Sequence, residues 1–131
     1  KKSSAPLISS PQEEEEQIFT LKPEDIGLIF SLRPDKKAVK FGIEKARDIS
    51  RVEYQIAYTK QVTGEEVPEG LIGEIINSDE STSLSTSYRE LGTCSSKVCR
   101  FDVVVSPVRL ILKVTKTDGK VYQVEDSLSL K

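Results

Sequence analysis

Residues 52–58 alternate between apolar and polar side chains, and this alternation constrains the fold more than any other feature of the sequence. Val52, Tyr54, Ile56 and Tyr58 occupy every second position, with polar or small residues between them. Successive side chains of a β-strand point to opposite faces, so the pattern gives one apolar face and one solvated face. We therefore expect a strand here that covers a hydrophobic core with one face.

The same period of two recurs along the chain, and turn residues separate the segments. No window of useful length repeats apolar residues at helical spacing, and the nearest candidate, 43–49, allows one or two turns at most. Residues 77–87 are rich in Ser and Thr and fit a weak edge strand or an exposed loop. The other β-prone segments are 28–33, 39–44, 71–76, 98–105, 109–115, 121–125 and 128–130. Seven or eight short strands predict an all-β fold, a two-sheet antiparallel sandwich.

One connection can be predicted in more detail. Asp118 and Gly119 stand between the β-prone segments 109–115 and 121–125. Because Asp-Gly tolerates the positive φ angles of a type I′ turn, we expect these two segments to form a hairpin.

Residues 18–131 resemble fibronectin type III and immunoglobulin-like modules in size, in strand spacing and in the alternating Tyr-rich segment 52–58. The resemblance is one of pattern, because the chain has no Trp and its two Cys are close neighbours, so the Cys, Trp, Cys arrangement of true immunoglobulin domains is absent. It implies an immunoglobulin/fibronectin III-like sandwich with an extracellular role in adhesion, spacing or recognition. No functional residue of the family can be transferred, since no motif matches.

Residues 1–17 differ in composition from the rest of the chain. They contain Ser, Pro and four consecutive Glu at 13–16, and they carry a net charge of −2. Such a segment cannot offset the entropy of ordering itself, which predicts a flexible acidic linker or stalk. A calcium loop would alternate its ligands and turn at a Gly, and this run does neither. We expect two parts, a stalk at 1–17 and a β-sandwich domain at 18–131.

The chain contains no Met, so we expect it to be a mature or excised segment of a longer protein. A Lys pair, here Lys1 and Lys2, commonly flanks the end of a signal or membrane anchor, and an arbitrary boundary is the alternative. No run of about 18 apolar residues is present, so contact with a membrane would depend on an N-terminal anchor outside this sequence.

The charge of the predicted domain argues against nucleic-acid binding. Residues 18–131 balance 17 basic against 17 acidic side chains and contain no basic stripe. The release of counterions from phosphate dominates nucleic-acid affinity and needs clustered Lys and Arg. We expect neither DNA nor RNA as a partner.

Cys94 and Cys99 are separated by four residues that include two Ser, a spacing that lets a turn bring the two sulfurs together. A structural zinc site needs about four ligands, and two Cys without any His do not supply them. A redox dithiol normally lies at the start of a helix, and two free thiols are the remaining alternative. The sequence predicts a structural disulfide, and hence an oxidising compartment outside the cytoplasm.

The absence of His removes the usual catalytic base and every Ser-His or Cys-His arrangement. Carboxylate pairs could in principle hydrolyse glycosides, but charged surface residues are the simpler interpretation of the acidic side chains. These carboxylates are Glu44, Asp48, Glu53, Glu74 and Asp102. We expect no catalytic residue, no cofactor and no metal site, and therefore no enzyme.

Two features suggest a binding surface: the hydroxyl-rich stretch 77–87, for which a plain mobile loop is the alternative, and four tyrosines. Tyr54, Tyr58, Tyr88 and Tyr122 are amphipathic, as interface residues often are. The alternative is that they line the core with the hydroxyl at its rim.

The leading functional hypothesis is a non-catalytic extracellular binding or structural module, tethered to a cell surface by the acidic stalk. The alternative is a subunit or spacer of a surface filament, similar to a pilin, and a third is a carbohydrate-binding module. The expected partner is a protein or a surface glycan, and the expected state is a monomer or a weakly self-associating species.

Overall fold

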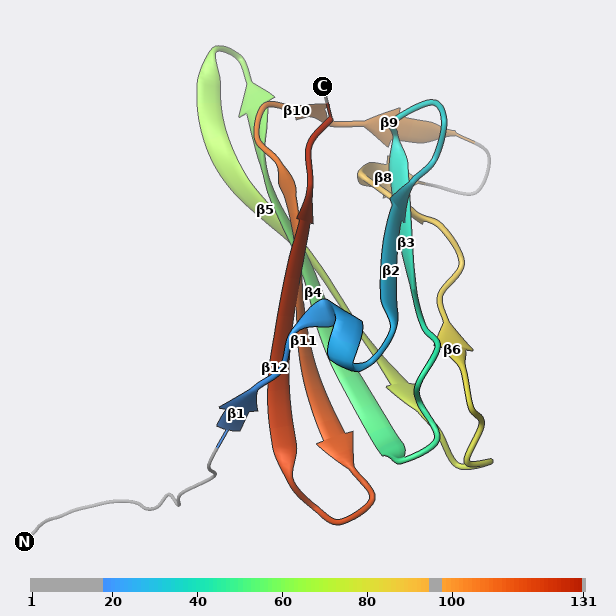
Figure 1. Ribbon diagram of the computed structural model, residues 1–131. Coiled ribbons are helices and arrows are strands. Elements are labelled where there is room, and N and C mark those ends of the chain that lie inside the picture. The colour runs from blue at the N-terminus through green and yellow to red at the C-terminus, as the bar shows by residue number, and fades with distance from the viewer. Residues whose placement is uncertain (1–17, 95–97, 131) are drawn as a thin grey trace, which may run out of the picture.

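The structure, a computed structural model, describes residues 18–94 and 98–130, and strands dominate this part of the chain (Figure 1). The described residues form twelve strands and one short 3-10 helix, η1 (Pro23–Asp25). The all-β fold class predicted from the sequence is confirmed. No helix in these described ranges is long and apolar enough to cross a membrane. The segment 1–17, expected to be a linker, lies outside the described residues.

A large sheet of six strands forms one layer. Its strands are β1 (Ile18–Thr20), β4 (Ile49–Val62), β5 (Glu65–Ile76), β10 (Val103–Val104), β11 (Val108–Lys116) and β12 (Val121–Leu128). The long strand β4 is central: β5 pairs with one of its edges, and β11 and β10 follow each other along the other edge. β12 pairs with β11, and β1 pairs with β12 in parallel orientation. β5 therefore lies at an edge of the large sheet.

A smaller antiparallel sheet forms the second layer. Its strands are β2 (Leu28–Leu32), β3 (Ala38–Ile43), β6 (Leu84–Ser85) and β7 (Arg89–Glu90). β2 pairs along β3, while β6 and β7 pair with the two ends of β3. A separate hairpin of β8 (Gly92–Cys94) and β9 (Cys99–Phe101) follows β7 in the chain.

The two sheets share one hydrophobic core. Phe41 of β3 and Tyr54 of β4 meet edge to face, with ring centroids 5.0 Å apart. The alternation predicted for residues 52–58 is confirmed, because the four apolar side chains of this segment are at most 8% exposed. The largest fully buried side chains come from both layers and their connections: Ile26, Phe41, Ile43, Ile49, Ile56, Leu91, Leu110 and Leu112.

The arrangement departs in two ways from the expected antiparallel sandwich of seven or eight strands. The large sheet is mixed, because β1 runs parallel to β12. Short breaks divide what the sequence presents as single segments, so that residues 98–105 yield both β9 and β10. Parallel pairing joins residues far apart in the chain without a turn between them, and it therefore leaves no local signal in the sequence. The structure confirms a fold of several sheets, and it is not a regular immunoglobulin sandwich.

The predicted hairpin of 109–115 with 121–125 is confirmed as β11 and β12, but the expected turn type is wrong. Among the described residues of this connection only Gly119 has a positive φ, whereas a type I′ turn needs two such residues in succession. The type I′ geometry occurs instead between β4 and β5, where Thr63 (φ 47°) and Gly64 (φ 84°) form a two-residue loop.

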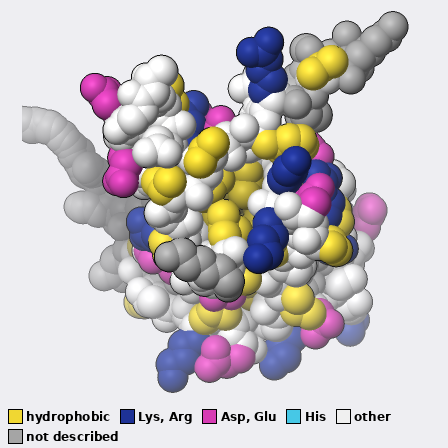
Figure 2. Space-filling model, turned by 90° about the horizontal axis from the view of Figure 1, so that it is seen from above, with side chains coloured by type: hydrophobic (Ala, Val, Ile, Leu, Met, Phe, Trp, Pro, Cys, Tyr) yellow, Lys and Arg dark blue, Asp and Glu magenta, His cyan; other side chains and the backbone are white. Residues whose placement is uncertain are grey.

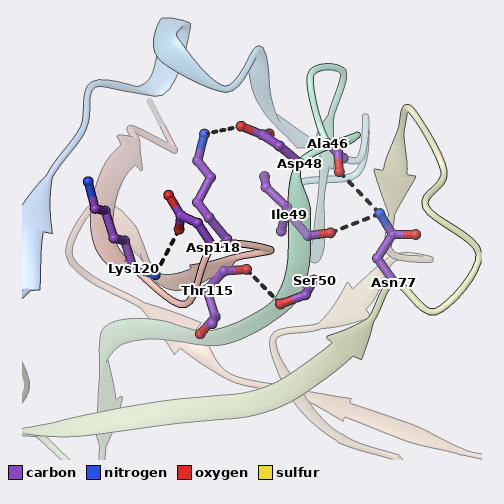
Figure 3. Close-up of polar contacts among 9 residues, drawn as sticks. Ala46, Asp48, Ile49, Ser50, Asn77, Thr115, Asp118 and Lys120 are labelled. Carbon is purple, nitrogen blue, oxygen red and sulfur yellow. Dashed lines mark hydrogen bonds and ion pairs between the residues drawn. The ribbon is translucent and has the colours of Figure 1, made fainter.

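The side-chain amide of Asn77 is buried at the end of the core near the β11–β12 turn (Figure 3). The Asn77 Nδ2 donates to the carbonyls of Ala46 (3.1 Å), Ile49 (3.0 Å) and Ser81 (3.1 Å). Its Oδ1 accepts from the Ser81 N–H at 2.9 Å. Asn77 thus joins the β3–β4 connection to the segment after β5, which the sequence suggested only as a weak strand or an exposed loop.

Candidate binding surface

Tyr54 and Tyr58, two of the four tyrosines singled out from the sequence, line the core. The ring of Tyr54 lies over Gly73, its cross-strand neighbour, and its hydroxyl accepts a hydrogen bond from Arg89 Nη1 at 2.6 Å. Because Arg89 belongs to β7, this bond joins the two sheets at one side of the core. Both tyrosines have their hydroxyls bonded to side chains at the edge of the core.

Tyr88 and Tyr122 keep partly exposed rings, but they belong to different parts of the molecule. Tyr88 precedes β7, and the cationic groups of Arg33 and Lys40 lie 5.7 Å and 4.7 Å from its ring centre. Tyr122 lies on β12, 5.7 Å from the ring of Phe19 on β1. A binding role for these tyrosines stays a prediction.

Tyr58 belongs to a group of four polar side chains at the end of the core nearest the β4–β5 hairpin. Its hydroxyl donates to Asp102 Oδ2 at 2.6 Å, and Lys60 Nζ lies 2.8 Å from Glu69 Oε2 and 4.0 Å from Asp102 Oδ1. Burial and the bond to Asp102 raise the pKa of the Tyr58 hydroxyl far above its usual value. The bond with Glu69 raises the pKa of Lys60, and the bonds from Lys60 and from the Gly70 N–H lower the pKa of Glu69.

These pKa shifts do not favour acid or base catalysis by the cluster. The pKa values of Tyr58, Lys60 and Glu69 all move away from neutral pH, whereas a general acid or base works best with a pKa near the working pH. The mutual contacts hold Tyr58, Lys60 and Glu69 in their ordinary charge states. The cluster also fastens β5 and the residue before β10 to β4.

The other carboxylates considered from the sequence lie at the protein surface. Asp48 is 2.8 Å from Lys116 Nζ, and Arg51 pairs with both Glu53 (3.4 Å) and Glu74. Glu44 is exposed at the end of β3. In the described part of the chain no three His, Cys, Asp or Glu side chains come together as a metal site would require.

The outer face of the large sheet, the face turned away from the core, contains a hollow of about 890 Å³. One row across the sheet explains it: Gly70, Ala57, Arg109 and Ser127 are successive cross-strand partners, and three of these four side chains are small or absent. The Arg109–Glu125 ion pair (3.2 Å) also lines the hollow. The hollow is open to solvent, unlike the enclosed pockets that bury most of a small ligand.

Large apolar side chains lie on the same outer face, along the edge strand β5. Ile72 is 76% exposed and Ile76 is 59% exposed, and both belong to the edge strand β5. A second depression, of about 640 Å³, is lined by Ile72, Ile111 and the charged residues around Arg51. Large apolar groups exposed on a folded domain commonly mark a contact surface.

The end of the molecule beside β10 is also apolar. Val62, Val103 and Val105 are exposed there. Figure 2 views the molecule from this end and shows hydrophobic side chains gathered in a hollow, with Lys, Arg and acidic side chains around them.

The backbone contacts of Thr59 on β4 show which residues of β5 direct their N–H and carbonyl groups to the open edge. Thr59 is the cross-strand partner of Pro68 on β5. Thr59 directs its N–H to Ser106 Oγ (2.8 Å) and its carbonyl to the Val105 N–H (2.9 Å), both away from β5. The pair of Thr59 and Pro68 is therefore not hydrogen-bonded, and Pro68 faces the open edge. Every second residue after Pro68 also directs its backbone N–H and carbonyl to the open edge, namely Gly70, Ile72, Glu74 and Ile76. No strand among the described residues pairs with this edge.

The sequence reasoning missed this edge, although one signal was present. Pro68 lies inside a β-prone stretch, and Pro within a strand is confined to edge strands or bulges because it has no N–H to donate. Read in that way, Pro68 extends the strand expected at 71–76 back to the Gly64 turn and places it at an edge.

The two cysteines lie opposite each other in the β8–β9 ladder as far as the backbone is concerned. Gly92 allows the close approach of these strands, because a Cβ there would meet the Phe101 Cα at 2.8 Å. The cysteine side chains and residues 95–97 lie outside the described residues, so the disulfide stays a prediction.

Comparisons of the chain with protein-family models, with curated proteins and with solved structures find no match.

Proposed function

We propose that this protein is a non-catalytic binding or structural module, and that it contacts its partner through the outer face of the large sheet and the adjoining edge of β5. One observation carries the proposal: Ile72 and Ile76 are exposed directly beside an edge with which no described strand pairs. Exposed apolar side chains next to unpaired backbone groups are a liability in a folded domain unless something covers them.

The cellular setting is part of the same proposal. The opposed backbone positions of Cys94 and Cys99 support a cystine that closes the β8–β9 hairpin, and such a bond forms outside the cytoplasm. An extracellular module on an acidic stalk, built on the general plan of immunoglobulin or fibronectin III domains, accounts for the two layers and for the composition of residues 1–17.

The proposal is tested by site-specific photocrosslinking in the cells that produce the protein. A photoreactive phenylalanine analogue replaces Ile72 in one variant, and Ile29 in the matched control, which is 52% exposed on the small sheet. We expect position 72 to give a discrete adduct that excess unlabelled protein suppresses, and position 29 to give none. No adduct from position 72, or equal adducts from both positions, would contradict a contact surface on this face.

A further inference from the structure

Resting on the proposed function, we propose that the C-terminal half of the β5 edge, Ile72–Ile76, binds an extended peptide segment of alternating basic and apolar side chains as an added strand. Addition of a strand to an open sheet edge is a common mode of peptide recognition, in which main-chain hydrogen bonds supply affinity and alternate side chains supply specificity.

The N-terminal half of the edge is closed to such a strand. Pro68 faces the edge and has no N–H to donate. The next N–H on this edge, that of Gly70, is already bonded to Glu69 Oε1 at 3.1 Å. Two successive positions are thus unable to donate to an incoming strand.

A comparable device closes part of the β12 edge. The Gln123 carbonyl bonds the Leu21 N–H and so faces away from β11, and by alternation Ser127 faces the same way. The Ser127 N–H donates to the Asp126 carboxylate at 2.8 Å. Natural sheets commonly close their edges in such ways.

The C-terminal half of the β5 edge has no comparable closure among the described residues. Ile72, Glu74 and Ile76 direct their N–H and carbonyl groups to the open edge and their side chains to the outer face. Two strongly exposed isoleucines therefore flank a glutamate on the face that an added strand would extend.

The charge of β5 selects the class of partner. The strand contains Glu65, Glu66, Glu69 and Glu74 and no Lys or Arg. Lys60 pairs with Glu69, and Arg51 is shared by Glu74 and Glu53. Glu65 and Glu66 form no ion pair with another described residue.

The acidity of β5 argues against a second copy as the partner, because pairing β5 with β5 would bring two acidic strands together. A segment with Lys or Arg opposite Glu74 and apolar residues opposite Ile72 and Ile76 matches both the charge and the exposed apolar side chains of the edge.

The test uses the chain of 131 residues, labelled with 15N, and the blocked nonapeptide KTVTKTVTK as probe. The control peptide has Glu in place of each Lys. We expect the probe, and not the control, to slow hydrogen exchange of the Ile72, Glu74 and Ile76 amides by at least about tenfold, because these amides acquire hydrogen-bond partners.

Two proline variants test the backbone contact, and a third is the matched control. E74P and I72P each remove one N–H from the open half, and E66P removes one from the same edge beyond Pro68. We expect E74P and I72P to abolish the protection at the remaining edge amides, and E66P to retain it. Unchanged exchange of the β4 and β11 amides shows in each variant that the fold is intact.

Other outcomes would overturn the inference. Chemical-shift changes at all four glutamates without amide protection would indicate electrostatic attraction alone. Protection that appears at high protein concentration without peptide would assign the edge to a second copy. If the peptide protects no edge amide, the peptide inference is wrong, but an adduct from position 72 would still support a contact surface on this face. If neither the protection nor the adduct is observed, both proposals are wrong.

Discussion

At the scale of single residues, Gly73 shows how one missing side chain shapes the core. It faces inward on β5, directly opposite Tyr54 on β4. A Cβ at this position would lie 2.7 Å from the Tyr54 Cε1 and still closer to the hydroxyl end of the ring. The glycine therefore makes room for the ring that bonds Arg89 and contacts Phe41.

We expect Gly73→Ala to destabilise the protein by about 1–3 kcal/mol, because the new methyl group displaces a buried ring. Gly70→Ala is the matched control on the same strand. Its Cβ would face the outer hollow, with the flexible end of Gln55 at 3.4 Å and the Ile56 carbonyl oxygen at an ordinary contact distance of 3.7 Å. Urea denaturation should give G70A a stability within about 0.5 kcal/mol of wild type. Equal losses for the two variants would contradict this account of Gly73.

Tyr58 predicts a dependence of stability on alkaline pH. Its pKa is raised by burial and by the bond to Asp102, so the folded state retains the phenolic proton after the unfolded chain has lost it. The resulting stability is complete below about pH 10, the ordinary pKa of Tyr, and is lost as pH rises above it.

We expect Tyr58→Phe to cost about 1.5–3 kcal/mol near neutral pH, the contribution of a hydrogen bond to a charged group. The difference between wild type and Y58F in urea unfolding should shrink steadily above about pH 10. A difference that stays constant with pH would show that the Tyr58 proton is not linked to folding.

Single residues were predictable from the sequence where their environment is set by their own strand. Val52 and Ile56 are buried as the period of two indicates, because alternation alone decides which face they join. Asn77 is the opposite case. Its amide is buried by Ala46 and Ile49, residues some 30 positions earlier in the chain, and nothing around Asn77 in a Ser/Thr-rich segment signals that contact.

At the scale of elements, the edge of β5 depends on Pro68. We expect Pro68→Thr to restore an N–H on the closed half of the edge, so that the peptide KTVTKTVTK also slows hydrogen exchange of the amide at position 68. A loss of about 0.5–1 kcal/mol in stability should accompany the change, since the unfolded chain gains freedom. Hydrogen exchange of 15N-labelled P68T with and without the peptide measures the effect, and P107T, changed outside the β5 edge, should respond as wild type. An amide at position 68 that exchanges equally fast with and without the peptide would argue that Pro68 does not close this edge.

The β8–β9 hairpin makes a prediction about the cysteines. If Cys94 and Cys99 are bonded, the non-reduced protein should weigh about 2 daltons less than the reduced protein. The double change to Ser should lower stability by about 2 kcal/mol, the contribution of so small a closed loop. Intact-mass spectrometry and thermal unfolding measure the two effects, and two titratable thiols in the native protein would refute the bond.

Elements were predictable to the extent that local chemistry defines them. The β11–β12 hairpin follows from alternation and from Gly119, but its turn type does not, because φ angles depend on how the flanking strands twist. The sequence predicts only 71–76 as a strand, because Pro68 and the nearby glycines are residues that also form turns. In the structure they are edge features within one strand of twelve residues.

At the scale of the whole molecule, the sequence predicts the layers better than their connection. Alternating faces require a core between sheets, and the structure has one. The parallel position of β1 and the division of strands between a large and a small sheet depend on contacts between distant segments. The candidate surface was accessible only in part: Pro68 marks an edge strand, but which strand of the sheet pairs with it depends on distant segments.

The central claim is that β5 is a folded strand with one edge bonded to β4 and one edge open. Amide hydrogen exchange of the free protein, resolved by residue, tests it most directly. We predict alternation along the strand: the amides of Leu71, Gly73 and Ile75 exchange slowly, and those of Ile72, Glu74 and Ile76 exchange fast. Uniform protection of all six would mean that the edge is covered, and uniform fast exchange would mean that the strand is not formed; either result would contradict the account.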